Sequence, residues 1–366
     1  MKILHLLPPG FGGVDAYVFN HYQYMDWSRF RFDFMTTSVG FRDAPQYRKY
    51  PHTVNILPVA GAENRVSLIQ TVQKILQKKY DALHLHTSFW TGTLIEEIAK
   101  DMGVPKVIVH AHSSYAEEKN DEKRQRILER HEAVKQSFKV DLATDYWACS
   151  QKAADWLFGR QIPRERIAIM QNAIEVDKYR FDPQLRASVR EKLGLGDAVV
   201  LGTVGRITYS KNHSFLVDMF AEFYKAHHNA KLLIIGDGEL REELQAQICE
   251  KHLEGAVLLS GWTTDVKCYL QAMDCFLLPS RFEGFPISVL EAVTAGLPCV
   301  VSENITDEII FSERIRQIPL SIPTWIITTE AMLKSQFDRS GGADIVHAAG
   351  YDVRLQAKVL ERMYEA

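Results

Sequence analysis

The sequence has few cysteines, and their spacing is not that of a stapled or metal-finger protein. Its 366 residues include five cysteines, an odd number, with no Cys-x-x-Cys pair. A disulfide framework of the kind that holds small secreted domains together is therefore not indicated. We expect free, mostly buried thiols in a reducing compartment, and we predict a cytoplasmic protein.

Long apolar runs and an excess of charge of one sign are also missing. No window approaches the roughly 18 to 20 consecutive apolar residues that cross a bilayer, and prolines interrupt residues 1–10 too early for a signal peptide. The net charge is −3, so no overall positive field is present to attract nucleic acid. We expect no nucleic-acid partner, and any membrane contact is predicted to be peripheral.

What is present is the composition of a globular chain with two domains. Apolar residues make up 46% and charged residues 24%, and 366 residues exceed one domain of about 150. Short β-branched runs alternate with longer amphipathic stretches, a pattern typical of parallel sheets covered by helices. The expected strands are Lys2–Leu7, Phe32–Thr36, Ala82–His86, Lys106–His110, Tyr146–Cys149, Arg166–Met170, Ala198–Val204, Lys231–Ile235, Ala256–Leu259, Cys275–Leu278 and Cys299–Ser302. The prediction is an α/β protein with two Rossmann-like domains that face a central cleft.

A polar stretch, residues 171–183, separates the two series of strands. We place the first domain at residues 1–175 and the second at 176–350. A final helix within residues 351–366 is expected to pack back on the first domain. The segment Glu117–Lys135 is rich in both charge signs and is predicted to be a solvated helix or a lid.

The most informative motif lies at residues 279–296, after an apolar strand. The stretch Glu283-Gly284-Phe285-Pro286-Ile287-Ser288 leads into a helix that Pro286 is suited to start. Amides at such a helix start form an anion site at the carboxyl edge of the sheet. Glu283 and Glu291 can flank that site and accept hydrogen bonds from sugar hydroxyls. A phosphate beside two carboxylates predicts a nucleotide sugar as the ligand.

Two further strand-to-helix loops are candidates for ligand contact. Gly205 and Arg206 follow a strand, with Lys211 five residues later, and the two cations are suited to a diphosphate. As an alternative, they are ordinary surface charges. In the first domain, Gly12 and Gly13 follow the first strand and let a ligand approach the backbone closely. That loop lacks the dinucleotide fingerprint, because Asp15 stands where the third glycine is required.

Taken together, these motifs resemble the retaining glycosyltransferases of the GT-B fold that use nucleotide sugars, and in particular members of family 4 that build exopolysaccharides and capsules. The motifs that carry the resemblance are Gly12-Gly13-Val14, Ala148-Cys149-Ser150, Gln171-Asn172-Ala173-Ile174, Gly205-Arg206 with Lys211, Ile235-Gly236-Asp237-Gly238, Gly261-Trp262 and Glu-Gly-Phe-Pro-x4-Glu-Ala from Glu283. Residues 303–308 depart from the common pattern of the family, and we expect no sugar contacts from them.

The resemblance implies roles for individual residues. The second domain would hold the donor, with Arg206 and Lys211 on the diphosphate, Glu291 on the ribose and Glu283 on the transferred sugar. Backbone contacts to the donor would come from Gly205 and from residues 284–288. The first domain would hold the acceptor, with Gly12, Gly13, His86 and His112 along the cleft and His112 at the reaction centre. Of His84 and His86, one is expected to face the cleft while the other packs.

The expected reaction is transfer of a hexosyl unit, with retention, from a nucleotide diphosphate sugar to a saccharide. A UDP-sugar donor, a polyprenyl-diphosphate-linked acceptor and a place at the inner membrane face follow from the resemblance alone. No cofactor and no metal are expected; histidine pairs spaced by two allow a zinc site, but that spacing is thin support for one. A nucleotide-sugar epimerase of similar build and a catalytically idle sugar-nucleotide-binding subunit remain alternatives.

Overall fold

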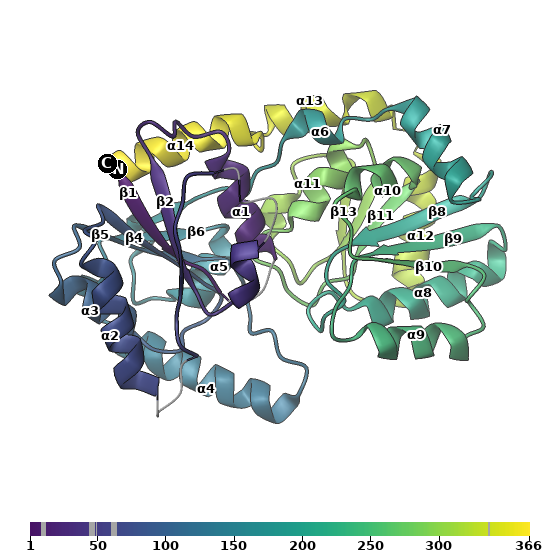
Figure 1. Ribbon diagram of the computed structural model, residues 1–366. Helices are drawn as coiled ribbons and strands as arrows, with labels where there is room; N and C mark the ends of the chain where they lie inside the picture. The colour runs from purple at the N-terminus through teal and green to yellow at the C-terminus, as the bar shows by residue number, and fades with distance from the viewer. Residues whose placement is uncertain (9–11, 44–47, 49, 60–63, 336) are drawn as a thin grey trace. The chain divides into compact units, whose positions relative to one another are not determined.

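The computed structural model describes residues 1–8, 12–43, 48, 50–59, 64–335 and 337–366, and the chain divides into two compact units (Figure 1). Unit 1 contains residues 1–172 and 353–366, and unit 2 contains residues 173–352. Each unit is a parallel β-sheet with helices packed on it, which confirms the predicted α/β class.

The sheet of unit 1 has seven parallel strands in the order β3-β2-β1-β4-β5-β6-β7. Its strands are β1 (Lys2–Leu6), β2 (Arg31–Thr36), β3 (Val54–Ile56), β4 (Ala82–Thr87), β5 (Lys106–Ala111), β6 (Asp145–Ala148) and β7 (Ile167–Ile169). Its helices are α1 (Gly13–Tyr22), α2 (Arg65–Leu76), α3 (Leu94–Asp101), α4 (Asp121–Ser137), α5 (Gln151–Leu157) and α14 (Val353–Glu365). The central strands are almost continuously buried, as parallel strands covered on both faces require.

The last helix of the chain, α14, belongs to the core of unit 1. Ala357, Leu360 and Tyr364 pack in one cluster with aromatic residues of α1 and β2. Its packing face follows the helical period, because buried residues recur three and four positions apart. The chain therefore returns to unit 1 after it has completed unit 2.

The sheet of unit 2 has six parallel strands in the order β10-β9-β8-β11-β12-β13. Its strands are β8 (Val199–Val204), β9 (Ala230–Ile235), β10 (Val257–Gly261), β11 (Cys275–Leu278), β12 (Cys299–Ser302) and β13 (Ile315–Ile318). Its helices are α6 (Val176–Tyr179), α7 (Pro183–Lys192), α8 (His213–Ala226), α9 (Arg241–Glu250), α10 (Val266–Ala272), α11 (Ile287–Thr294), α12 (Ile322–Lys334) and α13 (Gly342–Ala348).

The sequence did not predict two of the strands, and both lie at the edge of a sheet. β3 has three residues and β13 has four, and both contain polar side chains such as Asn55, Arg316 and Gln317. A half-buried strand this short leaves no apolar run to detect. All the predicted strands are present, with ends shifted by at most two residues.

The five cysteines are free thiols, and Cys149, Cys275 and Cys299 are buried. Among the described residues, no helix combines the length and the apolar character needed to cross a membrane.

Candidate functional site

The candidate donor residues lie where the order of strands in unit 2 reverses direction. β8 and β11 are hydrogen-bonded neighbours, yet β9 and β10 extend to one side of them and β12 and β13 to the other. The loops that leave the carboxyl ends of β8 and β11 therefore diverge to opposite faces of the sheet. Ligands of open parallel sheets bind in the crevice at such a point. Residues 205–212 follow β8, and residues 279–286 follow β11.

The two loops are fastened to each other by hydrogen bonds. The backbone amide of Arg281 donates to the carbonyl oxygen of Ser210 at 2.7 Å. The side-chain amide of Asn212 donates to the carbonyl oxygen of Pro279 at 3.1 Å. Asn212 has a left-handed backbone, with φ of 55°, a conformation that asparagine adopts more readily than most residues. The loop contacts hold the candidate residues of one loop at a fixed place against those of the other.

Lys211 and Glu283 form the central pair of the site. The ammonium group of Lys211 donates to Oε1 of Glu283, and the hydroxyl of Ser280 donates to the same oxygen at 2.8 Å. Both charged side chains are largely buried, with 20% and 15% exposed. A charge-assisted hydrogen bond in such surroundings orients both groups. The structure thus brings together two residues that the sequence places 72 positions apart.

Glycines let the neighbouring loops approach closely. A side chain at Gly236 would overlap the backbone carbonyl of Gly205, and one at Gly238 would overlap the backbone of Ile207. Gly205 itself has φ of +158°, and the position of its missing Cβ lies 3.2 Å from Cε of Lys211. The stem of Lys211 therefore lies against the bare backbone of Gly205.

Arg206 projects from the same loop but into solvent. Its side chain is 58% exposed and forms an ion pair of 3.6 Å with Glu239, which follows β9. The structure places Arg206 at the carboxyl edge of the sheet without joining it to the pair of Lys211 and Glu283. An exposed guanidinium in a weak ion pair can turn to a phosphate at little cost.

Glu291 lies on α11 and is bound by Tyr179, whose hydroxyl donates a hydrogen bond to the carboxylate. Desolvation raises the pKa of Glu291 to about 7, although the hydrogen bond from Tyr179 and the charge of Lys178 act in the opposite direction. The group therefore changes its charge near neutral pH. Glu283 is held by Lys211 and Ser280, and Glu291 by Tyr179.

The start of α11 lies directly after Glu283. Gly284, Phe285 and Pro286 are buried, and Pro286 caps the helix without a side-chain hydrogen bond. Ile287 and Ser288 form the first turn, where the backbone amides point away from the helix. The buried hydroxyl oxygen of Ser288 has no hydrogen-bond partner among the described residues. A phosphate at this helix start would supply an acceptor for the hydroxyl and charge that the helix dipole favours.

Three residues of this site were missed by the sequence analysis: Tyr179, Ser280 and Asn212. Ser280 stands within the motif at residues 279–296, but its hydrogen bond to Glu283 depends on the folded conformation of the loop. Tyr179 lies in the polar stretch taken as a boundary, 112 positions before Glu291. A contact at that distance leaves no local pattern in the sequence.

The candidate residues Gly12 and Gly13 of unit 1 lie after β1, at the start of α1. Gly12 precedes α1 and Gly13 is its first residue; both are exposed, and the Gly12 amide donates to Oδ2 of Asp15 at 2.8 Å. The same aspartate that breaks the dinucleotide fingerprint thus caps α1. Pro9, Gly10 and Phe11 lie outside the described residues.

The candidate histidines of unit 1 lie in a buried layer of imidazoles. Nδ1 of His86 is 2.8 Å from Nε2 of His112, which is partly exposed, and His86 is buried. That one of His84 and His86 faces the cleft while the other packs stays a prediction. Both are buried on one face of β4, because residues two apart in a strand share a face.

Comparison with known proteins shows the family of the chain. Residues 11–178 match the family described as Glycosyltransferase Family 4, and residues 186–308 match Glycosyl transferases group 1. The chain is 30% identical to the putative glycosyltransferase EpsF of Bacillus subtilis over 84% of this chain and 80% of that protein. It is also 30% identical to the UDP-Gal:alpha-D-GlcNAc-diphosphoundecaprenol alpha-1,3-galactosyltransferase of Escherichia coli over 64% of this chain and 61% of that enzyme.

The fold has counterparts among solved structures. Anabaena HepE, crystallised in complex with UDP and glucose, matches with a TM-score of 0.80 over the whole of both chains, at 19% identity. WaaG, a glycosyltransferase involved in lipopolysaccharide biosynthesis, matches with a TM-score of 0.74 over 99% of both chains, at 20% identity. At such identities the likeness concerns the fold.

Proposed function

The chain belongs to the glycosyltransferases of the GT-B fold, and from this premise we propose that it transfers a hexosyl unit from a nucleotide diphosphate sugar to a hydroxyl of a growing saccharide. Unit 2 would hold the donor and unit 1 the acceptor. The proposal includes retention at the anomeric carbon and cell-surface polysaccharide as the product.

The observation that carries this proposal is the ordered pair of Lys211 and Glu283 where the strand order reverses. A cation and a carboxylate held side by side suit the two groups that the breaking bond joins, the diphosphate and the hexose. The diphosphate is the anionic leaving group, and the hexose offers hydroxyl donors. Glu283 is then a positioning group for the sugar, and Lys211 meets the phosphate beside it.

The leaving diphosphate gains negative charge as the glycosidic bond breaks. Arg206, Lys211 and the first turn of α11 are suited to bind that charge more tightly in the transition state than in the ground state. We propose that these groups serve at the diphosphate in place of a metal ion. The exposure of Arg206 is consistent with a side chain that engages when the donor arrives.

Retention requires that the new bond form on the face from which the old one leaves. In the proposed step, the bond from the anomeric carbon to the phosphate oxygen breaks, and the acceptor oxygen bonds to that carbon. The acceptor proton passes to a phosphate oxygen of the leaving group. His112 is our candidate beside the reacting centre, because it is the partly exposed member of the histidine layer.

Uridine and a lipid-linked acceptor are the finer parts of the proposal. The E. coli relative is described by a UDP-galactose donor and a diphosphoundecaprenol-linked acceptor, and HepE was crystallised with UDP. Such an acceptor would bring the protein to the inner face of the membrane as a peripheral enzyme.

The test is transfer from a panel of UDP-sugars by the purified protein and by Arg206→Ala and Lys211→Ala variants. Each variant should lower turnover by roughly 10² to 10³, the effect of losing one group that stabilises a developing anion. Lys225→Ala is the matched control, because Lys225 is 71% exposed and pairs with Glu222 on α8. Unchanged turnover in both variants would overturn the roles assigned here. Consumption of the donor with no saccharide added would favour an epimerase.

A further inference from the structure

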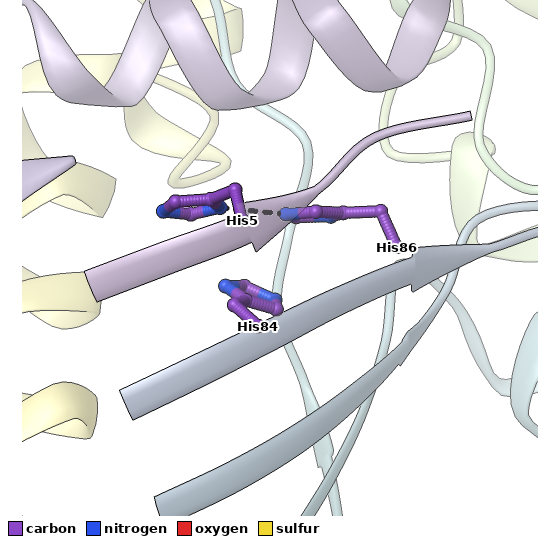
Figure 2. A group of neighbouring side chains, drawn as sticks. All are labelled: His5, His84 and His86. Atoms are coloured by element: carbon purple, nitrogen blue, oxygen red, sulfur yellow. Dashed lines mark hydrogen bonds between the residues drawn. The ribbon is translucent and has the colours of Figure 1, made fainter. Parts of the chain in front are cut away.

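Five histidines form a continuous layer on one face of the sheet in unit 1. They are His5 on β1, His84 and His86 on β4, His110 on β5, and His112, which directly follows β5. The strand register pairs His5 with His84 and His86 with His110, so the five side chains lie on the same face. Figure 2 shows His5 and His86 joined by a hydrogen bond, with His84 beside them.

The surroundings of this layer are aromatic. The ring of Tyr17 on α1 meets the rings of His110 and His112 at centroid distances of 5.0 and 5.3 Å, and the ring of Trp147 lies 4.9 Å from that of His84. Burial lowers the pKa of each of the five histidines below its usual range. Imidazole binds a metal ion in its neutral form.

Hydrogen bonds divide the layer into an outer and an inner part. His86 reaches outward from Nδ1 to Nε2 of His112 at 2.8 Å, and inward from Nε2 to Nδ1 of His5 at 2.9 Å. Nδ1 of His110 is 3.1 Å from Nε2 of His84, whose Nδ1 is 2.7 Å from the hydroxyl of Tyr364. The inner histidines, His5 and His84, thus lie within hydrogen-bond distance of His86 and His110. These two residues and His112 form the outer part of the layer.

One ring nitrogen of an outer histidine, Nε2 of His110, lacks a hydrogen-bond partner among the described residues. This nitrogen is buried. Leaving a buried polar atom unsatisfied costs about 1–3 kcal/mol. A ligand at Nε2 of His110 would remove this cost; Nε2 of His5, which also lacks a partner among the described residues, lies outside the proposed site.

We propose that His86, His110 and His112 bind one divalent transition-metal ion of the zinc class through three neutral imidazoles. One ring nitrogen of each lies within 4.8 Å of the others. A tetrahedral ion with bonds of about 2.0–2.1 Å needs its ligand atoms somewhat more than 3 Å apart, so small ring rotations complete the site. The ligand atoms would be Nδ1 of His86 and Nε2 of His110 and His112.

The inner histidines then act as outer-sphere partners. In this arrangement the Nε2–H of His86 donates to His5, and the Nδ1–H of His110 donates to His84. Metal-binding histidines are regularly oriented in this way through their second nitrogen. The alternative triad of His5, His84 and His86 also has its nitrogens close together, but all three side chains are fully enclosed. The outer triad includes the partly exposed His112, which gives an ion a way in.

The proposed metal ligands lie in unit 1, whereas the proposed diphosphate-binding residues lie in unit 2. His112 is common to this site and to the proposed reaction centre. The sequence analysis expected no metal, because the resemblance implies a family that works without one and because histidines spaced by two on neighbouring strands, with no paired carboxylate, are thin support for a zinc site. The new observation is that three strands bring five histidines to one face. The proposal does not depend on glycosyl transfer.

The experiment is a metal titration of the full-length, untagged protein after treatment with a chelator. With Co²⁺ we expect one equivalent to bind and give the visible absorption of a tetrahedral site. Zn²⁺ should displace the Co²⁺ and raise the melting temperature, because a ligand that binds the folded state stabilises it. His110→Gln and His112→Gln should each weaken Co²⁺ binding at least 100-fold, and His84→Phe by 10- to 100-fold.

His228→Gln is the matched control, because His228 is an exposed histidine of unit 2. Its Co²⁺ binding should equal that of the unaltered chain. Absence of stoichiometric Co²⁺ binding by the unaltered chain overturns the proposal, whatever the variants do. Binding that persists in His112→Gln, the variant at the partly exposed position, overturns it as well.

Discussion

The carboxyl group of Glu291 is placed to make donor binding depend on pH. Its folded pKa is raised to about 7 by desolvation, against an ordinary value of 4.5. Ribose hydroxyls donate hydrogen bonds, so the proposed contact favours the ionised carboxylate. Below pH 7 a bound nucleotide must first displace a proton from this group. The affinity for UDP should therefore weaken as the pH falls through 7, by up to tenfold for each further pH unit.

This expectation is checked by calorimetric titration of UDP between pH 5.5 and 8.5. Glu291→Gln removes the titrating group and should bind UDP with an affinity that changes little with pH. Glu254→Gln, at an exposed position, should keep the dependence of the unaltered chain. The role of Glu291 fails if Glu291→Gln shows the same pH profile as the unaltered chain.

At the scale of single residues, the sequence indicates some members of the candidate donor site but not the residues that hydrogen-bond to them. Glu283 and Lys211 were identified because each stands in a loop after a strand, where the chain order alone indicates a ligand edge. Ser280 and Tyr179 could not be assigned, because their hydrogen bonds depend on side-chain directions set by the folded loops. The pairing of Glu283 with Lys211 is likewise a consequence of two adjacent strands rather than of any motif.

At the scale of helices and strands, the sequence predicted an element well wherever a proline or glycine that starts or ends a helix stood next to an apolar run. α11 begins directly after Pro286, and Gly296 follows its end with φ of +76°, in the left-handed conformation expected of a helix-ending glycine. The edge strands β3 and β13 carry no comparable signal. The close approach of the loops after β8 and β9 was not predictable either, since it depends on which strands are neighbours.

That close approach leads to a prediction about Gly236. In Gly236→Ala the new methyl group would overlap the carbonyl of Gly205, at a residue whose φ of +143° already disfavours a side chain. The loop that carries Arg206 and Lys211 must move in response. We expect UDP affinity to fall at least tenfold and the melting temperature of the protein to decrease.

Gly255→Ala is the control for this change, because nothing lies within 4 Å of the position of its Cβ. Replacing such a glycine restricts the unfolded chain, so stability should be unchanged or higher by up to about 1 kcal/mol. The two variants are compared by thermal melting and UDP titration. Equal affinities in both would show that the loops tolerate the displacement.

At the scale of the whole molecule, the chain crosses between two units, and its last helix completes the first of them. Leu360 on α14 is 1% exposed in the core of unit 1, whereas Leu355 on the same helix is 47% exposed. Leu360→Ala should lower the free energy of unfolding of unit 1 by about 2–5 kcal/mol, the cost of a cavity in a packed core. Leu355→Ala should change it by less than about 0.5 kcal/mol.

Two domains need not unfold in one step, so the measurement must report on each unit separately. Hydrogen exchange meets this need, with peptides from β4 and β5 for unit 1 and from β8 and β11 for unit 2. In Leu360→Ala, exchange should accelerate in unit 1 peptides, while unit 2 peptides keep the protection that UDP gives them. Equal acceleration in both sets would mean that the two units unfold as one cooperative body, and that α14 stabilises the whole chain rather than unit 1.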